Sequence, residues 1–177
     1  LRKGGSAADA AIAVNAALAV VEPVACGLGG DLFALAWDPK RKRLDGLNAS
    51  GRAPLAARRE LVPATPEGTI PPYTPWAWTV PGAASGWFAL HARHGRLPMT
   101  TILAPAIALA EEGAPVPQHI AAAWKRSEKV FGQKPGFAQV FLPGGRAPAE
   151  GEVFRNPALA QTLRLLAGGG EAAYYRG

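Results

Sequence analysis

The sequence predicts an α+β fold, and three features of the chain point to that class. Residues 7–21 form an apolar, alanine-rich stretch of helical length, which is typical of a buried helix. Two short runs with apolar residues, 32–37 and 43–48, flank a polar turn and predict a β-hairpin. From residue 83 onward, the apolar spacing and the glycine stops become those of helices.

The first predicted helix, residues 7–21, has clear start and stop signals. Ser6 is a natural N-cap, and Asp9 lies in the first turn, where the helix dipole favours a negative charge. Pro23 follows the last turn and ends the helix. Because only Asp9 and Asn15 interrupt its apolar surface, we expect this helix to be buried on most sides.

The first strand of the predicted hairpin, residues 32–37, is apolar on both faces. Phe33, Leu35 and Trp37 share one face, and the aliphatic residues between them share the other. A continuous apolar run of this kind is typical of a strand that is buried on both sides. We therefore expect both faces of this strand to be covered.

The remaining chain divides into an irregular crossing and a helical part. Residues 61–82 hold too many prolines for a regular element, and their large aromatic residues predict either a crossing packed on the surface or a lid over a site. The helical part, residues 83–177, is predicted to contain helices 83–94, 100–112, 118–131 and 158–167 and a loop rich in glycine and proline over residues 132–151. Asn156 gives the last of these helices a cap, with Pro157 at the first helical position, and residues 168–170 end it. Together with a helix, loop and hairpin core over residues 4–54, these parts predict a single partial domain over residues 1–177.

Composition and charge exclude several classes of protein. The chain has a net charge of +6, yet its basic residues do not cluster among aromatic ones, so we expect no nucleic-acid binding and favour anionic small molecules or an acidic partner. The single cysteine, Cys26, excludes an internal disulfide framework. The longest apolar run, residues 7–21, is shorter than a bilayer span, so we expect no membrane-spanning segment.

A glycine-rich loop between the first helix and the hairpin is a candidate site wall. The residues we select there are Cys26, Gly27, Gly29, Gly30 and Asp31. Glycines let backbone amides approach a ligand closely, because no Cβ is in the way. The order is helix to strand and no Lys-Ser/Thr pair follows, which argues against a phosphate-binding loop.

Cysteine and histidine chemistry is poorly supported. Cys26 has no histidine nearby in the sequence, and a free cysteine beside glycine is more often a small buried apolar residue than a nucleophile. His91 and His94 have helical spacing that allows a shared metal ion, but no further ligand residue accompanies them. We therefore expect no metal site.

Arg52 is the strongest candidate for substrate binding. It lies between Gly51 and an Ala-Pro pair, which restrict the backbone on both sides. A rigidly held guanidinium is suited to two-point recognition of a carboxylate. No serine or threonine of the chain has the local signature of a nucleophile, such as Gly-x-Ser-x-Gly, so we assign no catalytic residue to these 177 residues.

Several motifs together resemble the start of the large subunit of the γ-glutamyltransferases. They occur in family order along the whole chain and are residues 4–11 (GGSAADAA), 22–23 (EP), 27–30 (GLGG), 52–54 (RAP), 80–82 (VPG), 86–87 (GW), 95–98 (GRLP), 104–107 (APAI), 110–113 (AEEG) and 174–177 (YYRG). Each motif alone is weak, but the ordered series is specific.

The resemblance implies an N-terminal-nucleophile hydrolase with a four-layer αββα sandwich that is only partly present in this chain. In this family a precursor cleaves itself, and the new N-terminal threonine of the small subunit attacks the γ-glutamyl amide of substrates such as glutathione, with its own α-amine as base. The acyl group then passes to water or to an amine, without a metal or organic cofactor. We expect the nucleophile to lie beyond Gly177, in the small subunit of the same precursor, and the 177-residue chain alone to be inactive.

Two departures from the family pattern affect the expected substrate. The arginine that typically grips the substrate α-carboxylate has Ser50 in its place, whereas Arg52 stands two residues later, a shift of roughly 6 to 7 Å in an extended chain. Cys26 and Asp31 also replace residues that are typically serine and glycine. The chain therefore resembles a divergent branch that includes cephalosporin-acylase-like members.

We expect Arg52 and Ser50 to contact the substrate and the residues from Cys26 to Asp31 to line the site. The alternatives are a catalytically inactive scaffold or binding module of the same fold, and a cephalosporin-acylase-like amidohydrolase. The expected location is cytoplasmic, or periplasmic or secreted if an N-terminal signal was lost.

Overall fold

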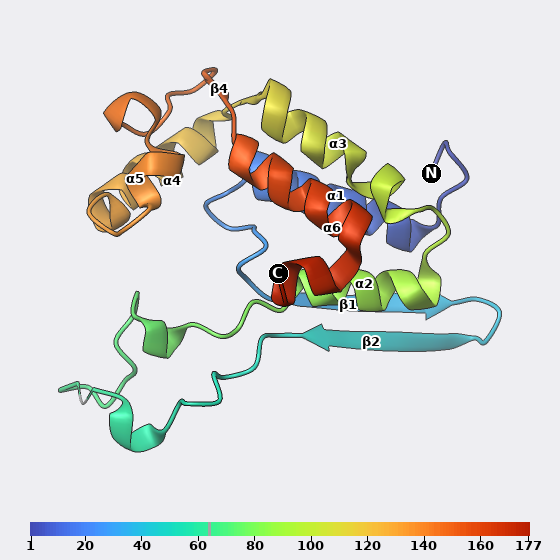
Figure 1. Ribbon diagram of the computed structural model, residues 1–177, viewed down its shortest axis with the longest axis horizontal. Helices are drawn as coiled ribbons and strands as arrows, with labels where there is room; N and C mark the ends of the chain where they lie inside the picture. Colours follow the sequence, from blue (N-terminus) through green and yellow to red (C-terminus); the bar gives the residue numbers. More distant parts are fainter. Residues whose placement is uncertain (64) are drawn as a thin grey trace. The chain divides into compact units, whose positions relative to one another are not determined.

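The computed structural model describes residues 1–63 and 65–177 and confirms the α+β class (Figure 1). Its helices are α1 (Ala7–Val21), α2 (Ala83–His94), α3 (Met99–Glu112), α4 (Gln118–Phe131), α5 (Phe137–Phe141) and α6 (Pro157–Tyr175). Its strands are β1 (Leu32–Asp38), β2 (Arg43–Ala49), β3 (Ala114–Pro115) and β4 (Val153–Phe154). The helices predicted over residues 83–94 and 118–131 have the observed bounds.

The chain forms two compact units, which we describe one at a time. One unit contains Leu1–Gly27 and His91–Gly177, and the other contains Leu28–Leu90. The single partial domain over residues 1–177, with its internal boundaries, stays a prediction. Residue 64, inside the predicted crossing 61–82, lies outside the described residues.

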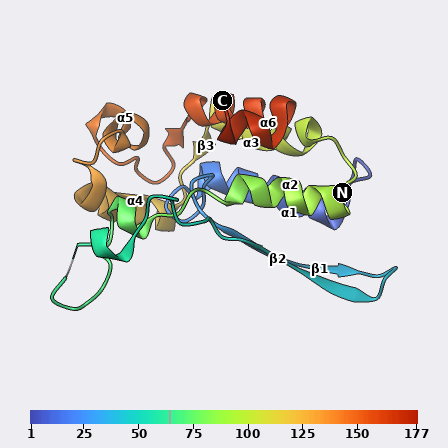
Figure 2. The same ribbon diagram turned by 60° about the horizontal axis from the view of Figure 1, so that its bottom comes forward.

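Three helices form the main body of the first unit. Helix α3 packs against both α1 and α6, and the views in Figures 1 and 2 show the three ribbons side by side. Their shared core includes Val20, Ala110 and Ala160, each at most 2% exposed. Small alanine side chains let the helices approach closely. Helix α1 is buried along much of its surface as predicted, although Val14 is 59% exposed.

The predicted start of α1 is confirmed as a capping box. The Ser6 Oγ accepts a hydrogen bond from the Asp9 N–H at 3.1 Å, and the Asp9 Oδ2 accepts one from the Ser6 N–H at 2.8 Å. Two N–H groups that lack a partner inside the helix are thereby satisfied. Asp9 itself is buried, with 3% of its surface exposed.

A second core in the same unit surrounds Trp124. The Trp124 ring lies edge-on to Phe154 at a centroid distance of 4.7 Å and to Phe141 at 6.1 Å. Helix α5 carries Phe137 and Phe141, four residues apart, onto this cluster. The loop predicted over residues 132–151 is therefore wrong in part, because tertiary packing of aromatic residues stabilises a short helix that composition does not reveal.

Helix α6 begins as predicted and continues beyond its predicted end. The Asn156 side chain caps it by accepting a hydrogen bond from the Leu159 N–H at 3.0 Å, and Pro157 occupies the first turn. The predicted stop at residues 168–170 is a break rather than an end. Gly170 has a φ of 71°, a left-handed conformation that suits glycine, and helical backbone resumes as far as Tyr175.

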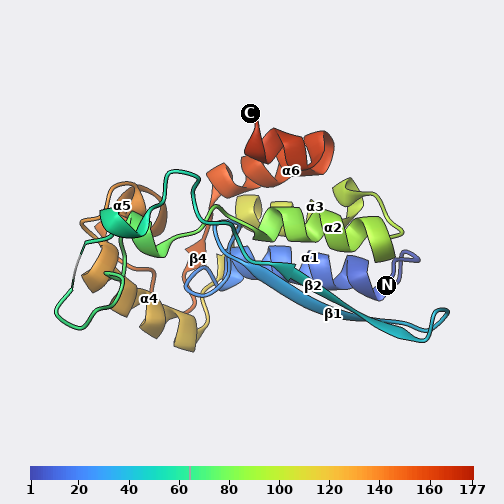
Figure 3. The same ribbon diagram turned by 90° about the horizontal axis from the view of Figure 1, so that it is seen from below.

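In the second unit, β1 and β2 form the predicted antiparallel hairpin (Figure 3). The strands pair from Leu32 opposite Ala49 to Asp38 opposite Arg43. Helix α2 packs on one end of the hairpin through Gly86, where an added Cβ would lie 2.8 Å from atoms of both Leu32 and Ala49. Glycine at this position therefore sets the close approach of helix and sheet.

The prediction that both faces of β1 are covered is wrong for the described chain. Phe33, Leu35 and Trp37 are 67%, 77% and 59% exposed, whereas the residues between them are half-buried. Apolar alternation shows which faces favour burial, but it does not show whether the covering element belongs to the same stretch of chain.

In its described residues, the crossing before α2 is irregular apart from two short helical turns, Arg59–Leu61 and Pro75–Ala77. Tyr73 and Trp78 are 51% and 59% exposed, so about half of each side chain is not covered by the described chain.

Candidate functional site

The backbone around Arg52 is held from two directions. The carboxylate of Asp31, the residue just before β1, accepts a hydrogen bond from the Gly51 N–H at 2.9 Å. The Arg52 carbonyl accepts a second one from the Val80 N–H at 2.9 Å. Segments that are far apart in the sequence thus meet around one arginine at the end of the hairpin.

Glycine is required at position 51 for this arrangement. A Cβ added there would overlap the Val80 carbonyl oxygen and would lie 2.8 Å from the Thr79 Cβ. Because the clash involves backbone as well as a side chain, it cannot be relieved by a rotamer change. The close contact between the Gly51 and Val80 segments therefore depends on the missing side chain.

A further link joins this region to the start of α2. The Gly30 carbonyl accepts hydrogen bonds from the Gly82 N–H at 3.0 Å and from the Ala83 N–H at 2.9 Å. Gly82 also approaches the Ala49 carbonyl so closely that an added Cβ would clash with it. Gly30 and Asp31, predicted as site wall, thus connect the start of β1 to the segment next to Arg52 and to the start of α2.

The Arg52 side chain is exposed, and no residue in the described ranges 1–63 and 65–177 pairs with its guanidinium. Other arginines of the hairpin differ, because Arg43 pairs with Asp45 at 2.7 Å and Arg41 pairs with Asp38 at 3.6 Å. A fixed backbone with an unpaired guanidinium is suited to binding a carboxylate from outside the chain.

Ser50, the second predicted substrate residue, is part of the turn that leads to Arg52. Its N–H and its Oγ donate to the Asn48 Oδ1, at 2.9 and 2.7 Å. Because the hydroxyl proton is used in this bond, the Ser50 oxygen remains available as an acceptor.

The other predicted wall residues fall on both sides of the division between units. Cys26 and Gly27 belong to the first unit, and Gly29 to the second. An added Cβ at Gly27 or Gly29 would meet no atom within 4 Å, so the packing described here does not require glycine at either position. That Cys26 and Gly27 join the Arg52 region in one site stays a prediction.

Cys26 lacks the surroundings of a reactive thiol. Its N–H donates to the Glu22 carbonyl at 3.0 Å, at the end of α1. Burial and, to a smaller extent, the negative charge of Glu22 raise the pKa of the Cys26 thiol. A raised pKa lowers the thiolate fraction near neutral pH, which disfavours nucleophilic catalysis.

One residue of the histidine pair on α2, His91, is used in a hydrogen bond within the chain. The His91 Nε2 lies 2.7 Å from the Leu97 carbonyl oxygen, a hydrogen bond that stabilises the turn after the helix. Among the described residues, no group of three or more histidine, cysteine or acidic side chains is placed to bind a metal.

Sequence reasoning missed the residues that hold Arg52 from the crossing. Thr79 and Val80 lie in an irregular stretch, and only the Val-Pro-Gly motif at residues 80–82 marked it. It also missed the second role of Asp9, whose carboxylate accepts hydrogen bonds from the N–H groups of Arg96 at 3.1 Å and Leu97 at 3.2 Å. Neither role has a local sequence signal, because the partners are distant in the chain.

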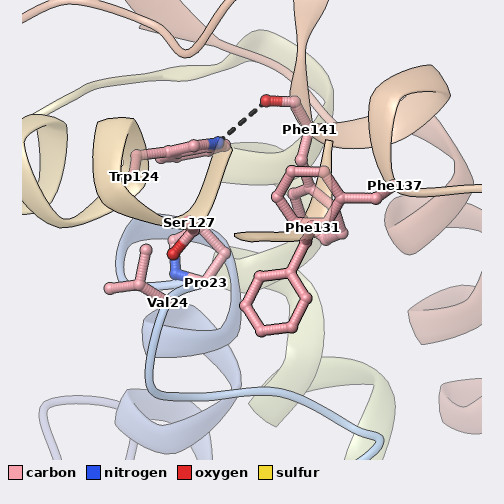
Figure 4. A pocket seen from close by; sticks show the side chains of 7 residues that line it. All are labelled: Pro23, Val24, Trp124, Ser127, Phe131, Phe137 and Phe141. Carbon is pink, nitrogen blue, oxygen red and sulfur yellow. Dashed lines mark hydrogen bonds between the residues drawn. The ribbon is translucent and has the colours of Figure 1, made fainter. Parts of the chain in front are cut away.

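A small apolar cavity of about 100 Å³ lies in the first unit, beside the aromatic cluster (Figure 4). It is lined by Pro23, Val24, Trp124, Ser127, Phe131, Phe137 and Phe141. Its polar side-chain groups are used internally, because the Trp124 Nε1–H donates to the Phe141 carbonyl at 2.8 Å and the Ser127 Oγ donates to the Ala123 carbonyl at 3.2 Å. Neither of these two side-chain donors is therefore free to orient a carboxylate in the cavity.

Comparison with known proteins identifies the family. A family model described as gamma-glutamyltranspeptidase matches residues 1–177, the whole chain. The chain belongs to the gamma-glutamyltranspeptidase family. The resemblance drawn from the ordered motifs is thereby confirmed.

Curated members of the gamma-glutamyltranspeptidase family match the full length of this chain. The oxamate amidohydrolase proenzyme of Klebsiella pneumoniae is 43% identical, and the glutathione hydrolase-like YwrD proenzyme of Bacillus subtilis is 37% identical. Glutathione hydrolase 3 of Arabidopsis thaliana is 32% identical. The chain spans about a third of the length of these relatives, since it covers 34%, 34% and 28% of them.

Solved structures confirm the fold expected for the family. Cephalosporin acylase from Bacillus halodurans aligns with a TM-score of 0.91 at 42% identity, over 100% of this chain and 34% of its own. The gamma-glutamyltranspeptidase of Helicobacter pylori aligns with a TM-score of 0.90 at 30% identity, over 99% of this chain and 51% of its own. The chain therefore has part of the fold of these N-terminal-nucleophile hydrolases. No helix in the described ranges is long and apolar enough to cross a membrane.

Proposed function

We propose that this chain forms the substrate-carboxylate-binding part of an enzyme that cleaves γ-glutamyl or similar acyl amides, such as glutathione. The enzyme passes the acyl group to water or to an amine. The observation that carries the proposal is the exposed guanidinium of Arg52, which pairs with no residue in the described part of the chain, on a backbone that Asp31 and Val80 hold in place. Membership of the family supports the proposed reaction class.

Arg52 and Ser50 have separate roles in this proposal. Two N–H groups of the Arg52 guanidinium donate to the substrate carboxylate, an interaction that fixes direction as well as charge. The Ser50 oxygen, whose proton is donated to Asn48, accepts a hydrogen bond from an N–H of the substrate. These contacts bind and orient the acyl group and do not take part in bond breaking.

The nucleophile that we propose is the N-terminal threonine of a small subunit from the same precursor. Its hydroxyl oxygen attacks the amide carbon, its α-amine accepts the hydroxyl proton, and the leaving amine receives that proton as the C–N bond breaks. The names of the relatives support a precursor, because two of the relatives quoted above are called proenzymes.

The exposed apolar face of the hairpin also supports the proposal of a partner from the same precursor. Phe33, Leu35 and Trp37 form an apolar surface of the kind that another protein surface covers. We propose that a second sheet of the same precursor covers it, which would complete the two inner layers of the αββα sandwich.

The test of the binding role is kinetic. In the complete, processed enzyme, Arg52→Ala is expected to raise KM for γ-glutamyl-p-nitroanilide at least tenfold, with a much smaller change in kcat. Arg58→Ala is the matched control, because Arg58 is also an exposed arginine, in the irregular segment after the site. An Arg52→Ala enzyme with the KM of the control would contradict the proposal.

A second candidate function is an amidohydrolase of a different carboxylate-bearing amide. The two relatives with the highest identity quoted above are named for oxamate and cephalosporin, at 43% and 42%, whereas the glutathione hydrolases are 32–37% identical. Comparing kcat/KM for oxamate, a cephalosporin and γ-glutamyl-p-nitroanilide decides between these substrates. The binding role of Arg52 is the same in each case if the substrate carries a carboxylate.

The third possibility is a catalytically inactive scaffold of the same fold. Mass spectrometry of the complete gene product distinguishes it, since an active member cleaves itself into two chains, of which the second begins at a defined threonine. A cytoplasmic location, with export as the alternative, also stays a proposal, and fractionation of the native cells tests it.

A further inference from the structure

We propose that Asp31 is a positioning residue, which fixes Arg52 for carboxylate binding through the backbone amide of Gly51. The inference rests on the proposed function of Arg52. It adds a specific residue and a specific hydrogen bond on which the affinity for the substrate depends.

The hairpin brings Asp31 and Gly51 together. Because Leu32 pairs with Ala49, the residues that enter β1 and leave β2 meet at the same end of the sheet. There the Asp31 Oδ1 accepts the Gly51 N–H at 2.9 Å and lies 3.4 Å from the Thr79 Oγ1. One carboxylate thus links the glycine loop, the end of β2 and the crossing.

The hydrogen bond between Asp31 and Gly51 restrains the backbone of the next residue, Arg52. Gly51 precedes Arg52 directly, so the hydrogen bond to Asp31 fixes the peptide group immediately before it. The Arg52 carbonyl is fixed on its other side by the Val80 N–H, at 2.9 Å. With both ends of its backbone held, the backbone of Arg52 loses little further conformational freedom when the side chain binds a ligand, which lowers the cost of binding.

The charge of Asp31 argues against a direct contact with the substrate. A carboxylate repels the carboxylate that Arg52 is proposed to bind, and Asp31 forms no ion pair with Arg52 among the residues that the structure describes. Its contacts are instead with a backbone N–H and a hydroxyl. A hydrogen bond to an ionised acceptor is about twice as strong as one between neutral groups, which suits a structural link.

The experiment compares two substitutions of Asp31 in the complete, processed enzyme. Asp31→Ala removes the acceptor, and we expect it to raise KM for γ-glutamyl-p-nitroanilide about tenfold while kcat changes less than threefold. Asp31→Asn keeps an oxygen that can accept the Gly51 N–H, and we expect its KM to stay within about threefold of the wild type. In an Arg52→Ala background, Asp31→Ala should change KM less than twofold, because the two residues act through one contact.

Hydrogen exchange gives a readout that does not depend on activity. The Gly51 amide should exchange about tenfold faster in Asp31→Ala than in the wild type and at nearly the wild-type rate in Asp31→Asn. The inference is overturned if exchange of this amide is unchanged in Asp31→Ala, if Asp31→Asn is as impaired as Asp31→Ala, or if Asp31→Ala still raises KM when Arg52 is absent. An unchanged KM in Arg52→Ala alone instead overturns the proposed function on which the inference rests.

Discussion

The carboxylate of Asp9 lies within 3.1 Å of the backbone nitrogen of Arg96, a residue 87 positions further along the chain. The same carboxylate caps α1 and accepts a hydrogen bond from the Leu97 N–H. It therefore connects the start of α1 to the turn between α2 and α3. The motif around residue 9 therefore has a structural role in this chain.

Removing this carboxylate should destabilise the protein strongly. Asp9→Ala leaves the N–H groups of Arg96 and Leu97 without their acceptor, and we expect a loss of about 3 kcal/mol in the free energy of unfolding. Urea denaturation of the complete protein measures it. Glu112→Ala, at an exposed acidic residue at the end of α3, is the control and should cost less than about 0.5 kcal/mol.

Asp9 should also make the free energy of unfolding depend on pH in the acid range. Burial alone would raise the pKa of Asp9, but hydrogen bonds from the N–H groups of Ser6, Arg96 and Leu97 outweigh it and hold this pKa below its usual value. Because the folded-state pKa is lower than the unfolded one, the stabilisation is complete above about pH 5 and is lost as the pH falls through the folded-state value. The difference in the free energy of unfolding between wild type and Asp9→Asn should become smaller below about pH 4. A gap that widens in acid would show that the carboxylate is held protonated.

Gly51→Ala should disrupt the substrate site through the backbone. The added Cβ would overlap the Val80 carbonyl, so the segment that presents Arg52 must move. We expect KM for γ-glutamyl-p-nitroanilide to rise at least tenfold and unfolding stability to fall by about 2 kcal/mol. Gly29→Ala is the matched control for stability, because its Cβ meets no atom within 4 Å and should leave the free energy of unfolding within about 0.5 kcal/mol. Equal destabilisation by the two variants would contradict the close contact at Gly51.

Cys26 should react slowly with alkylating reagents. Its raised pKa reduces the thiolate that attacks iodoacetamide, so the peptide containing Cys26 should be labelled more slowly at pH 8 than free glutathione in the same solution. Peptide mass spectrometry follows the labelling. Self-cleavage of the precursor should persist in Cys26→Ala, and its loss would assign the thiol a chemical role.

The sequence predicted helices well where the signals for them are local. The capping residues Ser6 and Asn156 marked the starts of α1 and α6, and apolar periodicity marked the bounds of α2 and α4. Helix α5 was missed because it lies between glycine- and proline-rich stretches and is held by the packing of its phenylalanines near Trp124.

The sequence predicted Arg52 as the binding residue, but it did not predict the residues that hold the Arg52 backbone in place. Arg52 was selected because its neighbours restrict the backbone, and the structure shows that restraint also comes from Asp31 and Val80. These partners are distant in sequence, and Val80 lies in a stretch with no periodic pattern, so no local rule connects them to Arg52. The uncovered face of β1 was likewise not predictable, because an apolar pattern does not identify what covers it.

The most direct test of the account is whether Arg52 recognises the carboxylate itself. It compares kcat/KM for γ-glutamyl-p-nitroanilide with that for γ-aminobutyryl-p-nitroanilide, which lacks only the α-carboxylate, in wild-type and Arg52→Ala enzyme. We predict that the wild type prefers the carboxylate-bearing substrate by at least tenfold and that Arg52→Ala abolishes most of this preference. An equal preference in both enzymes would contradict the account, because the carboxylate would then be bound by some other residue.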